Sequence, residues 1–219
     1  MSNLNDIVKT ITQNGRGKQL IVFVCGFGGA GKTTFCRRLC AEISCPAIVF
    51  ETDWFAKYPT EQRRERIRSA VASQNQELIE QEENPINWYD WPALVSDLKK
   101  LKESGRLEIR NGWSQRTGRK DFSIDLEIPT EGDSVIICDG IYLLHDAVKS
   151  AADLIVLLDT QVATCLNRSA ARDSHRSTKE YLDYKALLVD KYDKPYFELY
   201  SSNADMYVNV DGIISRPAL

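Results

Sequence analysis

Four glycines, a lysine and a threonine stand together in the segment GFGGAGKT, residues 26–33. Glycines let successive backbone N–H groups turn inward, so a short loop of this composition can surround an anion such as phosphate. The lysine adds a positive charge, and the threonine adds a hydroxyl of the kind that binds Mg²⁺. The spacing therefore predicts a loop that holds phosphate groups.

The surroundings of this segment are those that the pattern G-x-x-x-x-G-K-[ST] requires. The apolar run QLIVFVC precedes it, and KTTFCRRLCAEI, which has helical spacing, follows it. The positive end of that helix would point at the same anion. We therefore predict an ATP site on the residues Gly26, Phe27, Gly28, Gly29, Ala30, Gly31, Lys32, Thr33 and Thr34.

Three side chains are expected to act on the phosphates or on their metal ion. Lys32 would reach the β- and γ-phosphates, which makes it a catalytic candidate. Thr33 would place its hydroxyl on Mg²⁺, and Asp139, which ends the apolar run SVIIC, would hold the same ion directly or through water. Asp139 can also be read as part of a turn that ends a strand before Gly140.

Asp53 is the candidate for a catalytic base that also contacts the acceptor. It follows the apolar run AIVFE, at the carboxyl end of a predicted strand, where open parallel sheets bind their ligands. A carboxylate there can orient and deprotonate a hydroxyl group. The alternative is that Asp53 caps the N-terminus of a helix.

The segment NRSAARDSHR supplies arginines for a lid at about residues 168–178. Arg168 and Arg172 are four residues apart, on one face of a predicted helix, and guanidinium groups stabilise the charge of a transferring phosphoryl group. We predict both as catalytic and Arg176 as substrate-binding, whereas His175 is expected to be a surface residue. A solvated charged face is the alternative for the arginines.

Strands and helices alternate along the chain, which predicts a parallel sheet with helices on both faces. The expected class is α/β: a three-layer P-loop nucleoside triphosphate hydrolase fold, with a mainly parallel five-stranded sheet in a single domain spanning 1–219. The strands are expected at 19–25, 46–51, 133–140, 152–159 and 204–210. The helices are expected at 3–14, 32–43, 60–83, 91–105, 161–173 and 178–202, the last of them interrupted near Pro195. The insert at about 54–130 lacks long apolar runs and is expected to bind the acceptor.

Composition narrows the class of protein further. A net charge of −3 argues against a general nucleic-acid binder. No apolar run approaches the ~18 residues of a membrane helix, and the N-terminus lacks the apolar segment of a signal peptide. The six cysteines form no C-x-x-C pair, so we expect reduced thiols rather than a metal site. These features predict a cytoplasmic protein whose partner is a small molecule; they do not predict its oligomeric state.

Taken together, these segments resemble the uridine kinase family, within the phosphoribulokinase/uridine kinase group of P-loop kinases, over most of residues 20–211. GFGGAGKTT matches the family's phosphate loop, ETDWFAKY resembles its D-x-F-Y segment, and NWYDWPALVSDLKKLKESG resembles its N-F-D-H-P segment and the helix after it. The similarity continues through VIICDGIYLL, ADLIVLLDTQVATCLNRSAARD and YDKPYFELYSSNADMYV.

The resemblance implies an ATP- and Mg²⁺-dependent kinase that phosphorylates a hydroxyl group of a nucleoside or a similar metabolite. It places Asp53 on the acceptor hydroxyl, Asp90 on the sugar hydroxyls, and Arg168 and Arg172 in the lid.

The sequence departs from the family where the nucleobase is read. The family's Y-D-x-x-x-H-S-R stretch is here NGWSQRTGRK, with Trp113 roughly at the place of the tyrosine. All four tryptophans, at 54, 88, 91 and 113, fall in the insert. They predict either an aromatic pocket for a flat ring or a small satellite core, and we expect Tyr89 and Trp113 to contact the acceptor.

A nucleotide-dependent regulatory protein that hydrolyses ATP slowly is the alternative function. The charged segment 60–83 is compatible with a surface that binds a partner, and also with plain solvation. The two functions differ in acceptor dependence, because a kinase consumes ATP much faster when its acceptor is present.

Overall fold

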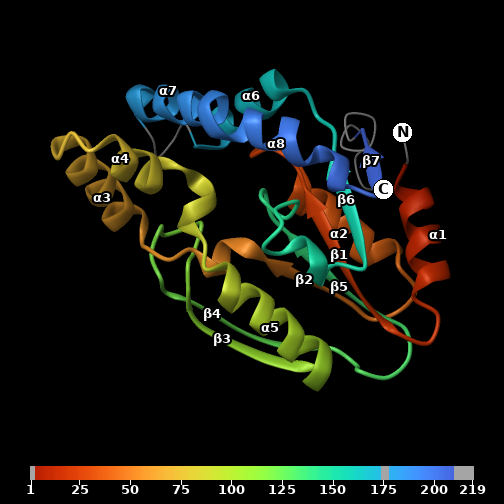
Figure 1. The fold of residues 1–219 in the computed structure, drawn as a ribbon. Helices are drawn as coiled ribbons and strands as arrows, with labels where there is room; N and C mark the ends of the chain where they lie inside the picture. The colour runs from red at the N-terminus through yellow and green to blue at the C-terminus, as the bar shows by residue number, and fades with distance from the viewer. Residues whose placement is uncertain (1–2, 174–177, 210–219) are drawn as a thin grey trace. The chain divides into compact units, whose positions relative to one another are not determined.

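The computed structural model describes residues 3–173 and 178–209 (Figure 1). The chain divides into two compact units. Unit 1 comprises Met1–Phe50 and Ile128–Leu219, and unit 2 comprises Glu51–Glu127. Unit 2 covers nearly the same stretch as the insert expected at about 54–130.

Unit 1 is built around a five-stranded sheet. Its strands are β1 (Gln19–Cys25), β2 (Ala47–Glu51), β5 (Ser134–Asp139), β6 (Leu154–Leu158) and β7 (Met206–Val208), in the order β2-β5-β1-β6-β7. β1 pairs in parallel with both β5 and β6, and β7 pairs in parallel with β6. The predicted five-stranded parallel sheet is therefore confirmed.

The central strands are mainly apolar because both faces of the sheet are covered. Every residue of β1, β5 and β6 is buried. On one face, Val22 and Ile137 belong to a core cluster with Ile7 of α1 (Leu4–Asn14) and Leu39 of α2 (Lys32–Glu42). Because β1 is buried in the sheet, its carboxyl end, and with it the start of the segment at residue 26, has a fixed position.

The remaining helices of unit 1 follow β6. They are α6 (Val162–Asp173), α7 (Lys179–Leu188) and α8 (Lys194–Tyr200), with a short 3₁₀ turn at Ser201–Asn203. Another short 3₁₀ turn, at Lys149–Ala151, precedes β6. A π-helical turn, η4 (Val189–Asp193), joins α7 to α8. Pro195 lacks an N–H group and crowds the preceding helical turn, and a wider turn before it lets the helix continue. The interruption expected near Pro195 is this turn.

Unit 2 combines helices with a two-stranded antiparallel hairpin. Its elements are η1 (Thr52–Phe55), α3 (Thr60–Ala72), α4 (Gln76–Glu83), η2 (Pro85–Trp88), α5 (Trp91–Ser104), β3 (Arg106–Gly112) and β4 (Phe122–Glu127). α5 buries Leu94, Leu98 and Leu101, and Gly105 ends it in the left-handed conformation. These apolar side chains give unit 2 its own small core.

The continuous helix predicted over 60–83 is wrong, because the chain breaks between α3 and α4. Gln74 has a φ of 55°, a left-handed conformation that cannot extend a right-handed helix. The side chain of Asn75 then accepts a hydrogen bond from the N–H of Leu78 and starts α4. Among the described helices, none is both long and apolar enough to cross a membrane.

Candidate functional site

The glycine loop, residues 26–34, leaves β1 and enters α2 in a shape that only glycine allows at two positions. Gly29 and Gly31 have φ values of 90° and 94°. A Cβ atom on Gly29 would lie 2.2 Å from the backbone oxygen of Cys165 in α6. Gly31 is the N-cap of α2 and has no side chain to occupy the helix N-terminus. The first N–H groups of α2 can therefore face a phosphate.

Lys32 folds back over the glycine loop. Its Nζ donates to the backbone oxygens of Gly26 at 3.0 Å and Phe27 at 3.1 Å. The ammonium group is thereby held at the loop, beside the N–H groups at the start of α2. An anion in the loop would meet both kinds of positive group.

Thr33 and Asp139 meet at the carboxyl edge of the sheet. The Thr33 hydroxyl donates to Oδ2 of the buried Asp139 carboxylate at 2.7 Å. Hydroxyl and carboxylate oxygens suit Mg²⁺, which usually takes one or two protein oxygens and completes its shell with water and substrate phosphates. The pair therefore fits a magnesium ion next to a nucleotide, and that assignment stays a prediction.

Asp53 and Tyr89 are brought together in unit 2. Asp53 lies within η1, directly after β2, and its Oδ1 accepts a hydrogen bond from the Tyr89 hydroxyl at 3.2 Å. The N-cap of η1 is Glu51, so capping does not account for the Asp53 side chain. A short antiparallel bridge between Ala56 and Tyr89 holds the two segments in register.

Asp90 has a structural role and also lines a cavity. Its Oδ1 accepts a hydrogen bond from the N–H of Ala93, which makes it the N-cap of α5. The same residue lies on the α5–β3 cavity, about 450 Å³ in volume. This cavity is lined by Trp54, Phe55, Lys57, Asp90, Ala93, Asp97, Glu108, Ile109, Arg110, Asn111, Gly112 and Lys120.

The two described lid arginines lie on α6. Arg168 is half-buried, and Arg172 is exposed and pairs with the buried Asp173, its Nε lying 3.0 Å from Oδ1. Lys185 of α7 also reaches Asp173, with 2.7 Å between Nζ and Oδ2. The remaining lid prediction, Arg176, and the surface prediction for His175 lie outside the described residues.

Comparison with known proteins adds the decisive observation. The model of the Phosphoribulokinase / Uridine kinase family matches residues 21–211. This chain belongs to that family. The resemblance stated from the motifs is therefore confirmed, and the chain is a small-molecule P-loop kinase with a nucleotide-binding loop.

Curated relatives and solved structures agree with this placement. A uridine kinase of Ureaplasma urealyticum serovar 10 is 22% identical over 166 residues, covering 74% of this chain and 72% of that protein. The structure of a proposed fructose transport system kinase from Silicibacter sp. TM1040 has a TM-score of 0.67 at 18% identity, covering 95% of this chain and 100% of that one. D-glycerate 3-kinase from Cryptococcus neoformans var. grubii has a TM-score of 0.62 at 14% identity, with 96% of each chain covered.

The tryptophans of the kinase serve mainly in packing. Trp54 stacks on Phe122, with 5.3 Å between ring centroids. The indole N–H groups of Trp88 and Trp91 donate to the backbone oxygens of Glu82 and Ile86. Trp113 differs: its Nε1 is buried and has no hydrogen-bond partner within the described part of the chain. Its indole N–H is therefore a buried donor whose partner is not among the described residues.

Sequence reasoning missed several polar residues of the α5–β3 cavity, among them Lys57 and Asp97. Asp97 lies two turns after Asp90 on α5, so helical spacing from Asp90 could have found it. Partial burial raises the pKa of Asp97, although Lys100 acts in the opposite direction. Lys57 donates from Nζ to the backbone oxygen of Asn87 at 2.9 Å.

The charges of α3 and α4 largely pair within unit 2. Arg66 bonds Glu82 through two hydrogen bonds, and its guanidinium also lies over the ring of Tyr58. The guanidinium of Arg63 lies 4.1 Å from the ring centroid of Trp88. These contacts give the charged segment a structural role in holding the two helices together.

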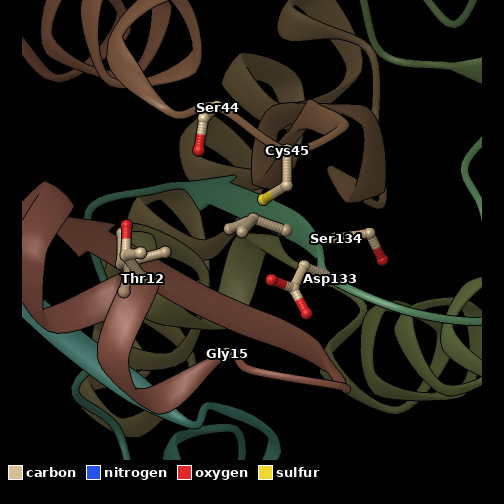
Figure 2. Close-up of a pocket in the computed structure, with 8 residues that line it drawn as sticks. Thr12, Gly15, Ser44, Cys45, Asp133 and Ser134 are labelled. Carbon is tan, nitrogen blue, oxygen red and sulfur yellow. The ribbon is translucent and has the colours of Figure 1, made fainter.

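Besides the α5–β3 cavity of unit 2, a cavity in unit 1 is too small for a substrate. Figure 2 draws its lining, which includes Thr12, Ser44, Cys45 and Asp133, and its volume is about 20 Å³, roughly that of one water molecule. It lies where β5 begins, whereas the glycine loop and Asp139 lie where β1 and β5 end. It therefore belongs to the opposite edge of the sheet from the nucleotide site.

All six cysteines are free thiols, as expected. Cys25 and Cys138 are fully buried within strands, and burial raises the pKa of Cys25 to about 12. Burial likewise raises the pKa of Cys36 and Cys138 well above the ordinary value. A thiol that stays protonated is a poor nucleophile and a poor metal ligand, so these three residues serve packing.

Proposed function

We propose that this kinase transfers the γ-phosphoryl group of ATP to a hydroxyl group of a small polar acceptor, a nucleoside or a similar metabolite. The observation that carries the proposal is the Asp53 carboxylate, which is half-buried at the end of β2 and held by the Tyr89 hydroxyl at 3.2 Å. A carboxylate with a fixed orientation can accept a proton from an acceptor hydroxyl.

Unit 1 supplies the groups that bind the donor. The N–H groups at the start of α2 and the Lys32 ammonium would hold the β- and γ-phosphates. Thr33 and Asp139 would hold Mg²⁺, which neutralises charge on the phosphate oxygens when it is bound. Arg172 would have to leave Asp173 to reach the transferring group, and Lys185 would then keep the buried Asp173 carboxylate paired.

Unit 2 supplies the groups that bind the acceptor. Asp53 would take the proton, and Tyr89 would hold Asp53 in place. Asp90 and the α5–β3 cavity offer carboxylate, amide and ammonium groups, which suit an acceptor with several hydroxyl groups. The buried Nε1 of Trp113 would donate to an acceptor oxygen.

The names of the relatives support an acceptor that carries hydroxyl groups. One is named for uridine and another for D-glycerate, and both of those compounds carry hydroxyl groups. The first test is therefore ADP production with Mg-ATP against a panel of nucleosides, sugars and hydroxy acids, with a control that lacks an acceptor. One compound that raises turnover by orders of magnitude would identify the acceptor. A slow background in every well would instead favour the regulatory alternative.

Substitution of Asp53 by Asn tests the proposed base. The variant keeps the shape and the hydrogen bond from Tyr89 but loses the proton acceptor. We expect kcat to fall by about 10²- to 10⁴-fold, the range that general-base catalysis contributes, while ATP affinity stays unchanged. Lys32→Ala is the contrasting variant, which should lose phosphoryl transfer together with nucleotide affinity. Full turnover by Asp53→Asn would exclude Asp53 as the base.

A further inference from the structure

Asp193 is a buried carboxylate of unit 1 that the proposed phosphoryl transfer does not use. It closes the π-helical turn η4, is 6% exposed, and accepts a hydrogen bond from the Tyr142 hydroxyl. Tyr142, itself 3% exposed, lies three residues after Asp139 on the segment that follows β5. Burying a carboxylate is costly, and such groups gather at functional sites.

The position of Asp193 on its helix directs it toward the glycine loop. Phe197 lies one turn further along α8, on the same face as Asp193. The ring of Phe197 packs on the ring of Phe27, with 4.2 Å between centroids. Phe27 belongs to the glycine loop, and its backbone oxygen accepts a hydrogen bond from Lys32. The face of the helix that carries Asp193 is therefore the face that packs on the loop.

Two positive charges and one hydrogen bond, each from a different segment, act on Asp193. Burial, the largest effect, raises its pKa to about 6. The Tyr142 hydrogen bond and the positive charges of Lys32 at the start of α2 and Lys185 on α7 lower that pKa. Lys32 of the glycine loop is thus one of the two positive charges that favour the ionised form of Asp193.

The other charged groups of the same turn form a surface pair. Asp190 lies 2.5 Å from Lys194, and both side chains are well exposed. Lys191 lies over the ring of its neighbour Tyr192. Among the described residues of this turn, Asp193 is therefore the charged residue that is buried.

We propose that Asp193 is a positioning residue that sets the nucleotide affinity of the glycine loop through Lys32. In its ionised form the carboxylate attracts the Lys32 ammonium and repels the phosphates, so it weakens nucleotide binding. In its neutral form it does neither, and the ammonium is available to the phosphates. The inference rests on the proposed nucleotide site, and it adds a regulatory group to that site.

The test measures the dissociation constant of Mg-ADP by titration calorimetry at about pH 5, 6 and 7.5, below, at and above the raised pKa. Asp193→Asn should bind Mg-ADP about 3- to 10-fold more tightly than the natural protein at the highest pH and equally at the lowest. The comparison between variants cancels the titration of ADP itself. Asp190→Asn is the matched control on the same turn, and it should bind like the natural protein throughout.

Tyr142→Phe keeps the inference testable if Asp193→Asn fails to fold. It removes the hydrogen bond that lowers the pKa of Asp193, so the pH at which affinity changes should move upward. Identical pH profiles for the natural protein and for whichever of these two variants folds would overturn the inference while leaving the nucleotide site intact. Failure of the natural protein to bind Mg-ADP at any pH would instead overturn the nucleotide site, and the inference with it.

Discussion

Individual side chains of this kinase divide into those proposed to bind the phosphates and their metal ion and those proposed to bind the acceptor. Lys32, Thr33 and Asp139 come from one motif and one strand end, and the structure brings the last two within 2.7 Å. Asp53 and Tyr89 are 36 residues apart in the chain, and a short bridge between Ala56 and Tyr89 joins their segments. Phosphate binding is thus encoded locally, whereas the acceptor groups depend on how unit 2 folds.

Trp113→Phe tests the buried indole donor. The phenyl ring keeps most of the shape and removes the N–H group that has no partner within the described residues. Losing one hydrogen bond to the acceptor should raise its KM by about 3- to 10-fold, with little change in kcat. Steady-state kinetics with the identified acceptor would measure this.

The control for this substitution is Trp88→Phe, because the Trp88 indole already donates to Glu82. That variant should lower thermal stability and leave the KM for the acceptor unchanged. If both variants raise KM alike, Trp113 has no specific contact with the acceptor.

The ends of most helices and loops of this chain follow from nearby residues. The exceptions are positions where a single residue takes an unusual backbone conformation or, as at Pro195, cannot fit a regular helix. The glycine loop needs left-handed backbone at Gly29, where α6 also passes too closely for a side chain. The break between α3 and α4 places Gln74, which is not glycine, in the same region. Pro195 is accommodated by a π-helical turn rather than by the end of the helix.

Gly29→Ala should distort the glycine loop. The added Cβ would lie 2.2 Å from the backbone oxygen of Cys165, and the residue would be strained at a φ of 90°. We expect the free energy of unfolding to fall by about 2 to 4 kcal/mol, together with a large loss of nucleotide affinity. Chemical denaturation would measure the first effect.

Gly28→Ala is the matched control in the same loop. Its Cβ would meet only the Ile141 side chain, at 3.8 Å, and its φ is not positive. Its stability should therefore stay within about 1 kcal/mol of the natural protein. If both variants lose stability equally, the close approach of the Cys165 oxygen to residue 29 is not the reason why the loop rejects a side chain.

The free energy of unfolding of the whole molecule should depend on pH through the titration of Asp193. Burial raises its folded-state pKa to about 6 from an ordinary value of 3.8, so the folded state favours the neutral carboxyl group. Its contribution to stability is therefore largest below about pH 4, falls as the pH rises toward 6, and is constant above that. At 1.36 kcal/mol per pKa unit, the change is on the order of 2 to 3 kcal/mol.

Asp193→Asn removes this titration and keeps an oxygen that can accept the Tyr142 hydrogen bond. The variant should gain stability relative to the natural protein as the pH rises from about 4 to 7, a trend that urea unfolding at several pH values would follow. A difference between the two proteins that does not vary with pH would show that Asp193 has an ordinary pKa in the folded state.

The sequence by itself determined the glycine loop, the parallel sheet and the family. Each of these rests on neighbouring residues: a phosphate loop is one continuous segment, and a buried strand is one continuous apolar run, as in β1 and β5. The same local rules predicted α1, α2 and α5 closely, because capping residues and apolar spacing mark helix ends.

Only the tertiary structure decided which distant side chains meet. It made Asp90 a helix cap that also lines a cavity, and it paired Asp173 with both Arg172 and Lys185. It also buried the Nε1 of Trp113 without a hydrogen-bond partner among the described residues. It also buried Asp193 beside Tyr142, although the sequence gives no sign that this carboxylate differs from its exposed neighbour Asp190. The physical reason is that burial and electrostatic coupling depend on packing between elements, which no local pattern records.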